Sequence, residues 1–220
     1  MRPHLPRPGN APTRTVGYGA RVTTALPQAP VPMFPLPAAF LFPHQALPLH
    51  VFEPRYRALV GDLLDGPGRF VLGTILPQAE AAPEAPPHVL PVAGLGEILR
   101  HEKLADGRYL IWVLGLCRVR IEEVASAKPY RLVRCHPFVE QDVPADASEG
   151  LAVELRAATT ARLRHPLPLP EHAPPSLLCD LLLQTLSAPP EVLAHAFGEP
   201  SIEQRARYVL GEAERTPPPA

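Results

Sequence analysis

Side chains that could take part in a reaction gather between residues 47 and 66, in the stretch LPLHVFEPRYRALVGDLLDG. This stretch holds the imidazole of His50, the carboxylate of Glu53, the guanidinium groups of Arg55 and Arg57, and the phenol of Tyr56. Such groups could form a catalytic constellation, because they can donate, accept or hold protons and bind anions. The same residues could instead form a corner at which a strand turns into a helix.

The local pattern favours the corner. Leucine and valine alternate with proline and histidine over residues 47–51, a period of two that is typical of a short strand. Pro54 keeps Glu53 extended and is itself suited to the first position of a helix. We therefore expect Glu53 at the corner, with its carboxylate facing the helix N-terminus or an arginine such as Arg55. Gly66 is expected to end the helix in a left-handed conformation, after an apolar stripe made by Tyr56, Leu59, Val60, Leu63 and Leu64.

Composition sets the wider limits on function. The chain has 220 residues, a formal net charge of −1 and 46% hydrophobic residues, enough for one sizeable domain or a domain of two lobes. The balanced charge does not point to a polyanion or a membrane surface as partner. No apolar run is long enough to span a bilayer and no signal peptide is recognisable, so we expect a cytoplasmic protein. The three cysteines, which are expected to be buried thiols, are Cys117, Cys135 and Cys179.

The chain divides into zones of different character. Residues 1–30 are rich in proline and arginine without periodicity, and we expect a disordered extension there. About seven strands are predicted between residues 31 and 140, interrupted by a surface loop over 77–91. Asp106-Gly107 is expected to close a tight hairpin. In the segment LCRVRIEE the alternation predicts a half-buried sheet, with Cys117, Val119 and Ile121 on one face and Arg118, Arg120 and Glu122 on the other.

Helical periodicity replaces the strand pattern over residues 146–214. A first helix is predicted from Ser148 or Glu149 to Arg164, and a second after the proline-rich segment 166–175, with its leucines inward. Ser187 is expected to cap a short third helix, and a capping box from Ser201 to Gln204 opens the last. Residues 215–220 form a tail. A β-rich lobe followed by a helical lobe is an α+β arrangement. The leucines expected to face inward are Leu177, Leu178, Leu181 and Leu182.

Three segments carry a resemblance to a known family. They are MFPLPAAFLFPHQALPLHVFEPRYRALVGDLL, GLGEILRHEKLADGRYLIWVLGLCRVRI and SIEQRARYVL, in that order. Together they resemble the Lon N-terminal substrate-binding domain over about Val31 to Glu214. The resemblance implies a PUA-like β-barrel lobe over 31–140 and a helical lobe over 146–214. It also implies that the matching motif positions are structural rather than catalytic: Phe42, Pro43, Leu49, Phe52, Glu53, Pro54, Arg55, Tyr56, Gly96, Gly107, Gly115 and Arg118.

Signatures of catalysis do not accompany these motifs. The sequence has no phosphate-binding loop, and the chain's two lysines leave no serine–lysine pair spaced for a protease dyad. His165 and His172 lack a third ligand nearby, and the spacing of Asp62 and Asp65 is read as a solvated helix face. We therefore expect no enzyme activity, no cofactor and no metal. The resemblance implies a free-standing module that binds unfolded or partly folded proteins, with a separate protease or ATPase as a further partner.

RNA binding is the alternative function, because PUA-like lobes bind RNA in other families. It would require several arginines to gather on one sheet surface, but acidic residues interleave with them and the overall charge is near zero. The oligomeric state stays open. Met33 stands directly before the first motif, so a start of translation at Met33 competes with a disordered extension as the explanation for residues 1–30. The arginines that RNA binding would require on one surface are Arg100, Arg118, Arg120, Arg131 and Arg134.

Overall fold

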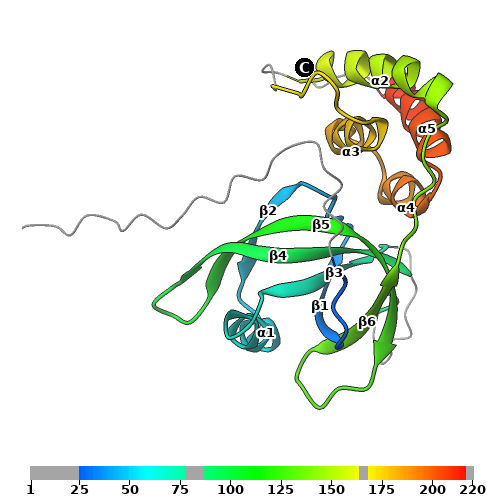
Figure 1. Ribbon diagram of the computed structural model, residues 1–220. Coiled ribbons are helices and arrows are strands. Elements are labelled where there is room, and N and C mark those ends of the chain that lie inside the picture. Colours follow the sequence, from blue (N-terminus) through cyan, green and yellow to red (C-terminus); the bar gives the residue numbers. More distant parts are fainter. Residues whose placement is uncertain (1–24, 78–86, 164–167, 217–220) are drawn as a thin grey trace, which may run out of the picture.

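A computed structural model describes residues 25–77, 87–163 and 168–216 (Figure 1). A sheet lobe comes first in the chain and a lobe of helices follows, so the predicted α+β class is confirmed. Most of the predicted extension, the greater part of the 77–91 loop and most of the tail lie outside the described residues. The sheet lobe consists of β1 (Val31–Pro37), β2 (Ala46–Val51), α1 (Pro54–Leu64), β3 (Arg69–Ile75), β4 (Val92–Lys103), β5 (Tyr109–Val124) and β6 (Arg131–Pro137).

The six strands form one sheet in the order β2-β5-β4-β3-β1-β6, and β6 also pairs with β5. This second pairing closes five strands into a barrel and leaves β2 as an added strand on β5. β1 and β3 are parallel, because the connection between them contains β2 and α1, and the other pairs are antiparallel. In Figure 1 the hairpin of β4 and β5 extends away from the barrel.

The strand count differs from the prediction because β5 is a single strand of 16 residues. Its two halves, read from the sequence as separate strands, have different partners. Residues 109–114 pair with β2, whereas residues 119–124 pair with β6. Gly115 lies between them, and a Cβ atom there would be 1.9 Å from the carbonyl oxygen of Phe42. The absence of a side chain at Gly115 thus lets the segment before β2 cross directly over β5.

Helix α1 begins at Pro54, as predicted, and buries Tyr56, Leu59, Val60 and Leu63 against the barrel. Two details differ from the prediction. Leu64 is 36% exposed and is not among the buried residues of α1. The left-handed residue after the helix is Gly68, with a φ of 70°, rather than Gly66. At the β4–β5 turn, Gly107 is left-handed (φ 82°), and its amide donates to the carbonyl of Leu104.

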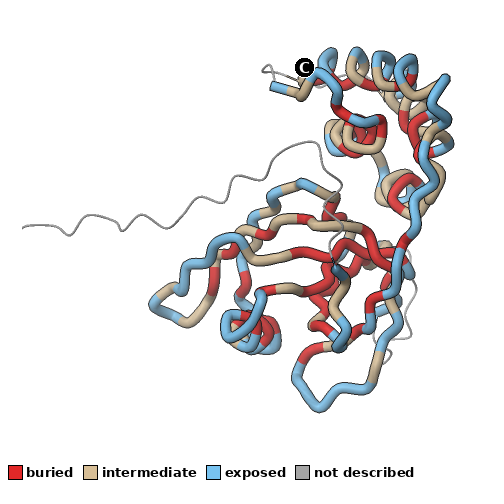
Figure 2. The backbone as a smooth tube through the Cα atoms, in the orientation of Figure 1, coloured by how far each residue is buried: buried red, intermediate tan, exposed pale blue. Residues whose placement is uncertain are grey.

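The barrel is filled by two clusters of apolar side chains. One cluster includes Phe34, Leu59 and Phe70 and lies between the sheet and α1, and the other includes Met33, Leu95 and Val119. Figure 2 shows that buried residues are frequent along the strands of the barrel. Leu26, which falls within the predicted extension, packs against the second cluster.

The helical lobe contains α2 (Ala145–Thr160), α3 (Pro175–Thr185), α4 (Pro190–Gly198) and α5 (Ile202–Arg215). The predicted start of the first helix at Ser148 or Glu149 was three or four residues too late, because Pro144 already precedes a regular turn. The helix ends at Thr160, before the predicted end at Arg164. Pro189 rather than Ser187 occupies the N-cap of α4. Ser201 caps α5 by accepting a hydrogen bond from the amide of Gln204, although its own amide donates to Glu199 instead of to Gln204.

The apolar core of this lobe reaches the barrel. Leu155, Leu178 and Leu182 are fully buried in a cluster that also contains Phe40 and Phe42 from the segment before β2. The ring of Phe197 in α4 lies 5.3 Å from that of Phe42 and 5.4 Å from that of Phe40, measured between centroids. The two lobes are therefore joined by a shared aromatic contact, which fixes how the helices stand on the sheet.

Candidate functional site

The predicted corner forms a local ion pair. Glu53 is the N-cap of α1, and its extended backbone (φ −64°, ψ 136°) makes the turn from β2. Its carboxylate accepts a hydrogen bond of 2.9 Å from Arg55 Nε and makes no hydrogen bond to the helix N-terminus. The Arg55 guanidinium also lies over the ring of Tyr56, 4.5 Å from its centroid. Since the Arg55 and Glu53 side chains are 53% and 39% exposed, this pair holds a surface corner.

The remaining motif residues around β2 have different environments. Phe42 is buried between the lobes, and its amide donates to Gln45 Oε1, whereas Pro43 is half-buried in the same turn. Leu49 packs toward the barrel core, while Phe52 is 60% exposed. At Gly96 a Cβ atom would lie 2.6 Å from Leu41 and Val113 side-chain atoms, so close packing requires glycine there. The structure therefore does not bring the twelve motif residues together in one site.

The prediction that Arg118 lies on the exposed face of a half-buried sheet was wrong. The alternation in β5 predicted an exposed arginine, but the Arg118 side chain is 2% exposed because the helical lobe covers this part of the strand. Its Nη2 and Nη1 atoms donate to the two carboxylate oxygens of Asp180 in α3, at 2.6 and 3.0 Å. Its Nε donates to the carbonyl of Phe197. Arg118 thus binds two helices to the sheet through a bidentate, charge-assisted contact.

A second arginine completes this buried cluster. Arg205 of α5 is fully buried, and its Nη2 lies 2.7 Å from Glu140 Oε1, while its Nε lies 4.0 Å from Asp180 Oδ1. Burial lowers the pKa of Arg205, but the carboxylates of Asp180 and Glu140 outweigh burial and the pKa is raised. The cluster thus contains two guanidinium groups and two carboxyl groups. We call Arg118, Glu140, Asp180 and Arg205 the interlobe cluster.

Sequence reasoning found only Arg118 of this cluster. A single acidic residue inside the apolar run SLLCDLLLQTL was the available signal, because a carboxylate among leucines at the centre of a helix needs a buried cation. Leu177 and Leu181, predicted to face inward, are only partly buried, since α3 is rotated to point Asp180 at the sheet.

An apolar surface lies on the outside of the sheet, where β2, β5 and β4 are adjacent. Side chains directly opposite each other on paired strands share a face. Pro48 pairs with Trp112 and Ala46 with Leu114, and these side chains point away from the barrel, whose core is reached instead by Ile111 and Val113. Arg100 of β4 pairs with Trp112, and its guanidinium lies 5.0 Å from the indole centroid. We call this surface the outer face, made by Ala46, Pro48, Arg100, Leu110, Trp112 and Leu114.

The outer face is not part of a core. Within the described ranges, Leu110, Trp112 and Leu114 belong to none of the three apolar clusters that fill the two lobes. Each of the three is partly exposed, and Ala46 and Pro48 beside them are exposed. A row of large apolar side chains that solvent reaches is a common mark of a protein-binding surface.

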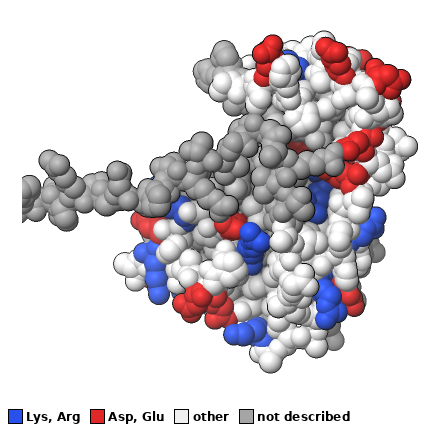
Figure 3. All heavy atoms as spheres, viewed as in Figure 1, with Lys and Arg blue, Asp and Glu red and all other residues white. Residues whose placement is uncertain are grey.

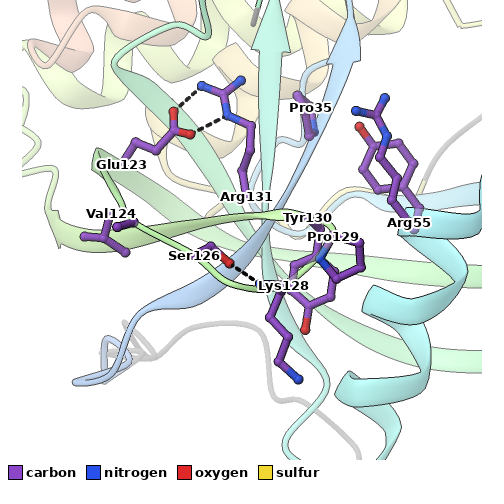
Figure 4. A pocket seen from close by; sticks show the side chains of 11 residues that line it. Pro35, Arg55, Glu123, Val124, Ser126, Lys128, Pro129, Tyr130 and Arg131 are labelled. Atoms are coloured by element: carbon purple, nitrogen blue, oxygen red, sulfur yellow. Dashed lines mark hydrogen bonds and ion pairs between the residues drawn. The ribbon is translucent and has the colours of Figure 1, made fainter.

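A cavity of about 300 Å³ lies at the opposite side of the barrel, between α1 and the β5–β6 turn. Figure 4 shows the salt bridge of Glu123 with Arg131 on one wall of the cavity and Arg55 on the other. Lys128 pairs with Asp62, which also accepts a hydrogen bond of 2.5 Å from Tyr130. Burial, followed by this hydrogen bond, raises the pKa of Tyr130 to about 12. The cations that line this cavity are all paired, because Arg55 contacts Glu53, Lys128 contacts Asp62 and Arg131 contacts Glu123.

The described residues contain no group of three or more ligands arranged to hold a metal ion. Cys135 and Cys179 are buried, as expected, whereas Cys117 is only partly buried. Burial raises the pKa of the Cys135 thiol to about 11 and that of the Cys179 thiol to about 12. No helix in the described part of the chain is long and apolar enough to cross a membrane.

The arginines considered for RNA binding do not form one surface. Arg118 is buried in the interlobe cluster, Arg131 is paired with Glu123, and Arg134 lies 3.8 Å from Glu122. Figure 3 shows basic and acidic side chains interspersed on the visible face rather than gathered by sign.

Comparisons with known proteins agree on one family. Residues 30–215 match the model of the ATP-dependent protease La (LON) substrate-binding domain. Lon protease 2 of Syntrophobacter fumaroxidans is 30% identical over 141 residues, which are 64% of this chain and 18% of that protein. Lon protease 2 of Sorangium cellulosum is 31% identical over 130 residues, which are 59% of this chain and 16% of that protein. The chain thus spans less than a fifth of the length of these bacterial relatives.

Solved structures show the same fold. A Lon N-terminal domain protein from Xanthomonas campestris has a TM-score of 0.60 at 17% identity, covering 83% of this chain and 98% of that one. The N-terminal domain of Lon protease from the Mycobacterium avium complex has a TM-score of 0.61 at 13% identity, covering 84% and 98%. With the family model matching most of its length, the chain belongs to the Lon substrate-binding domain family.

Proposed function

We propose that this chain is a non-enzymatic module that binds extended apolar segments of unfolded or partly folded proteins on its outer face. The observation that carries the proposal is the row of Leu110, Trp112 and Leu114, which the fold leaves outside its cores. Membership in a substrate-binding family supports the same role. Recognition of exposed apolar segments suits protein quality control in the cytoplasm, in which a separate protease or ATPase would act on what this module holds.

The expected affinity follows from the size of the surface. One apolar side chain buried on the outer face contributes about 1.5–3 kcal/mol, so two anchors contribute about 3–6 kcal/mol before ordering costs. A micromolar Kd requires about 8 kcal/mol. A single short segment should therefore bind weakly, and chains that offer several apolar anchors should bind more tightly.

Trp112 provides a direct assay, because it is the only tryptophan in the chain and lies in the middle of the outer face. Titration with reduced, unfolded casein should change the Trp112 fluorescence, and the titration should depend little on salt. Leu110→Ser should weaken binding severalfold. Val153→Ser is the matched control, because Val153 is an exposed apolar residue (63%) on α2, away from the sheet.

Two results would contradict this proposal. Equal casein affinities for the Leu110→Ser and Val153→Ser variants would show that the outer face is not the binding surface. Tight binding of single-stranded RNA that falls steeply with salt would favour the nucleic-acid alternative instead.

A further inference from the structure

One side of β2 is open. β2 is the end strand of the sheet order, it pairs with β5 along one side, and no other described strand pairs with it. A free strand edge presents backbone N–H and C=O groups that an additional strand can bind. The edge borders the outer face, because Ala46 and Pro48 contribute side chains to that face.

The register shows which backbone groups point to the open side. In an antiparallel pair, residues that exchange hydrogen bonds with the partner strand alternate with residues whose groups point away. The amide of Gly115 donates to the carbonyl of Gln45 at 2.8 Å. Steps of two residues from Gln45 place Leu47, Leu49 and Val51 in the bonded positions. The outward groups therefore belong to the alternate, exposed residues Ala46, Pro48 and His50.

Proline occupies one of the outward positions, where its missing N–H does not weaken the pairing with β5. The open edge consequently offers three acceptors, the carbonyls of Ala46, Pro48 and His50, but only two donors, the amides of Ala46 and His50. A symmetric antiparallel pairing of two β2 edges about Pro48 would place two prolines opposite each other, without a central hydrogen bond. The edge thus disfavours this pairing with a second copy of itself and retains most of its capacity for a different strand.

We infer that the β2 edge binds the main chain of an extended polypeptide segment, which becomes an additional strand of the sheet while its alternate side chains pack beside the outer face. This inference rests on the proposed function and specifies how the segment is held. Main-chain hydrogen bonds do not depend on sequence, so this geometry accepts many different unfolded chains. Apolar side chains on one face of the segment would lie next to Pro48 and Trp112.

Two substitutions change the hydrogen bonds of the open edge without changing those to β5. His50→Pro removes one outward donor, and His50→Ala, its matched control, removes the imidazole but keeps the amide. Pro48→Ala adds the missing donor. The probe is a fluorescein-labelled peptide of alternating leucine and threonine with lysine at both ends, and binding is measured by fluorescence anisotropy.

His50→Pro should bind the probe about three- to tenfold more weakly than His50→Ala, the change expected for one hydrogen bond. Pro48→Ala should bind it more tightly than wild type by a similar factor. If His50→Pro does not fold, Pro48→Ala and a probe N-methylated at alternate amides decide the question. Methylation of one set of alternate amides should abolish binding, and methylation of the other set should not.

Equal affinities for all these variants, with binding still weakened severalfold in Leu110→Ser, would overturn the edge mechanism and leave the proposed function standing. Failure of the wild-type protein to bind either casein or the probe would overturn the proposed function itself. If Pro48→Ala forms dimers in sedimentation without binding the probe more tightly, the edge pairs with its own copy and the inference is wrong.

Discussion

Asp180→Asn should destabilise the protein strongly, because it removes one of the two negative charges of the interlobe cluster. The substitution keeps the shape of the side chain. Arg118 and Arg205 would remain buried, with side-chain exposures of 2% and 0%, and only Glu140, 32% exposed, would balance them. Breaking a buried ion pair by removing one partner costs about 3–5 kcal/mol. In a chain of this length, that cost corresponds to a melting temperature lower by about 6–20 °C.

Urea unfolding followed by two signals measures this effect. Trp112 fluorescence follows the sheet lobe, and circular dichroism at the helical minimum is dominated by the helical lobe. Because Arg118 in β5 and Asp180 in α3 connect the lobes, the two transitions should separate in the variant and coincide in wild type. Glu154→Gln is the control, since the exposed pair of Arg207 and Glu154 (53% and 54%) should contribute less than about 1 kcal/mol. An Asp180→Asn variant no less stable than Glu154→Gln would refute the reasoning.

Three smaller predictions concern other positions. Glu53→Ala should cost no more than about 1 kcal/mol in a thermal melt, because its ion pair is exposed; a larger loss would reveal a partner other than Arg55. The pKa of Cys179, raised by burial to about 12, means that this thiol favours folding fully below its ordinary pKa of 9.0 and that stability is lost as pH rises above it. Iodoacetamide should therefore spare Cys179 until urea is added, and labelling of Cys179 in the native protein would contradict its burial. Gly115→Ala should unfold the protein or sharply lower its melting temperature, whereas Gly150→Ala, where a Cβ meets nothing within 4 Å, should not.

The strand–helix corner could be predicted because its determinants are local. Pro54 restricts both its own conformation and that of the residue before it, and the change from a period of two to a helical period occurs at the same point. Local rules were less reliable for the helical lobe. Pro144, Pro174 and Pro189 occupy the N-caps of α2, α3 and α4 without a side-chain hydrogen bond. The predicted start of α2 at Ser148 or Glu149 and the predicted cap of α4 at Ser187 were therefore wrong.

The interlobe cluster could not be predicted from periodicity. Arg118 alternates with buried residues in the pattern that an exposed arginine would show, and its burial depends on Asp180, which lies 62 positions away. The outer face is the opposite case, because there apolar residues are partly exposed. Its leucines and Trp112 are apolar enough to suggest a core, but the barrel closes on the other side of β5, and no local feature of the sequence reveals which side is covered.

The closure of the barrel has a consequence for how the chain folds. Val31 pairs with Val133, so the strand pairing that brings β1 beside β6 joins residues about a hundred positions apart. Such non-local pairing is slow, because the entropy of closing a long loop must be lost before the contacts form. The helices, whose hydrogen bonds are local, can form earlier. During this interval the chain itself presents unpaired apolar strands, and a module that we propose to hold unfolded proteins must first complete its own slow β-strand assembly.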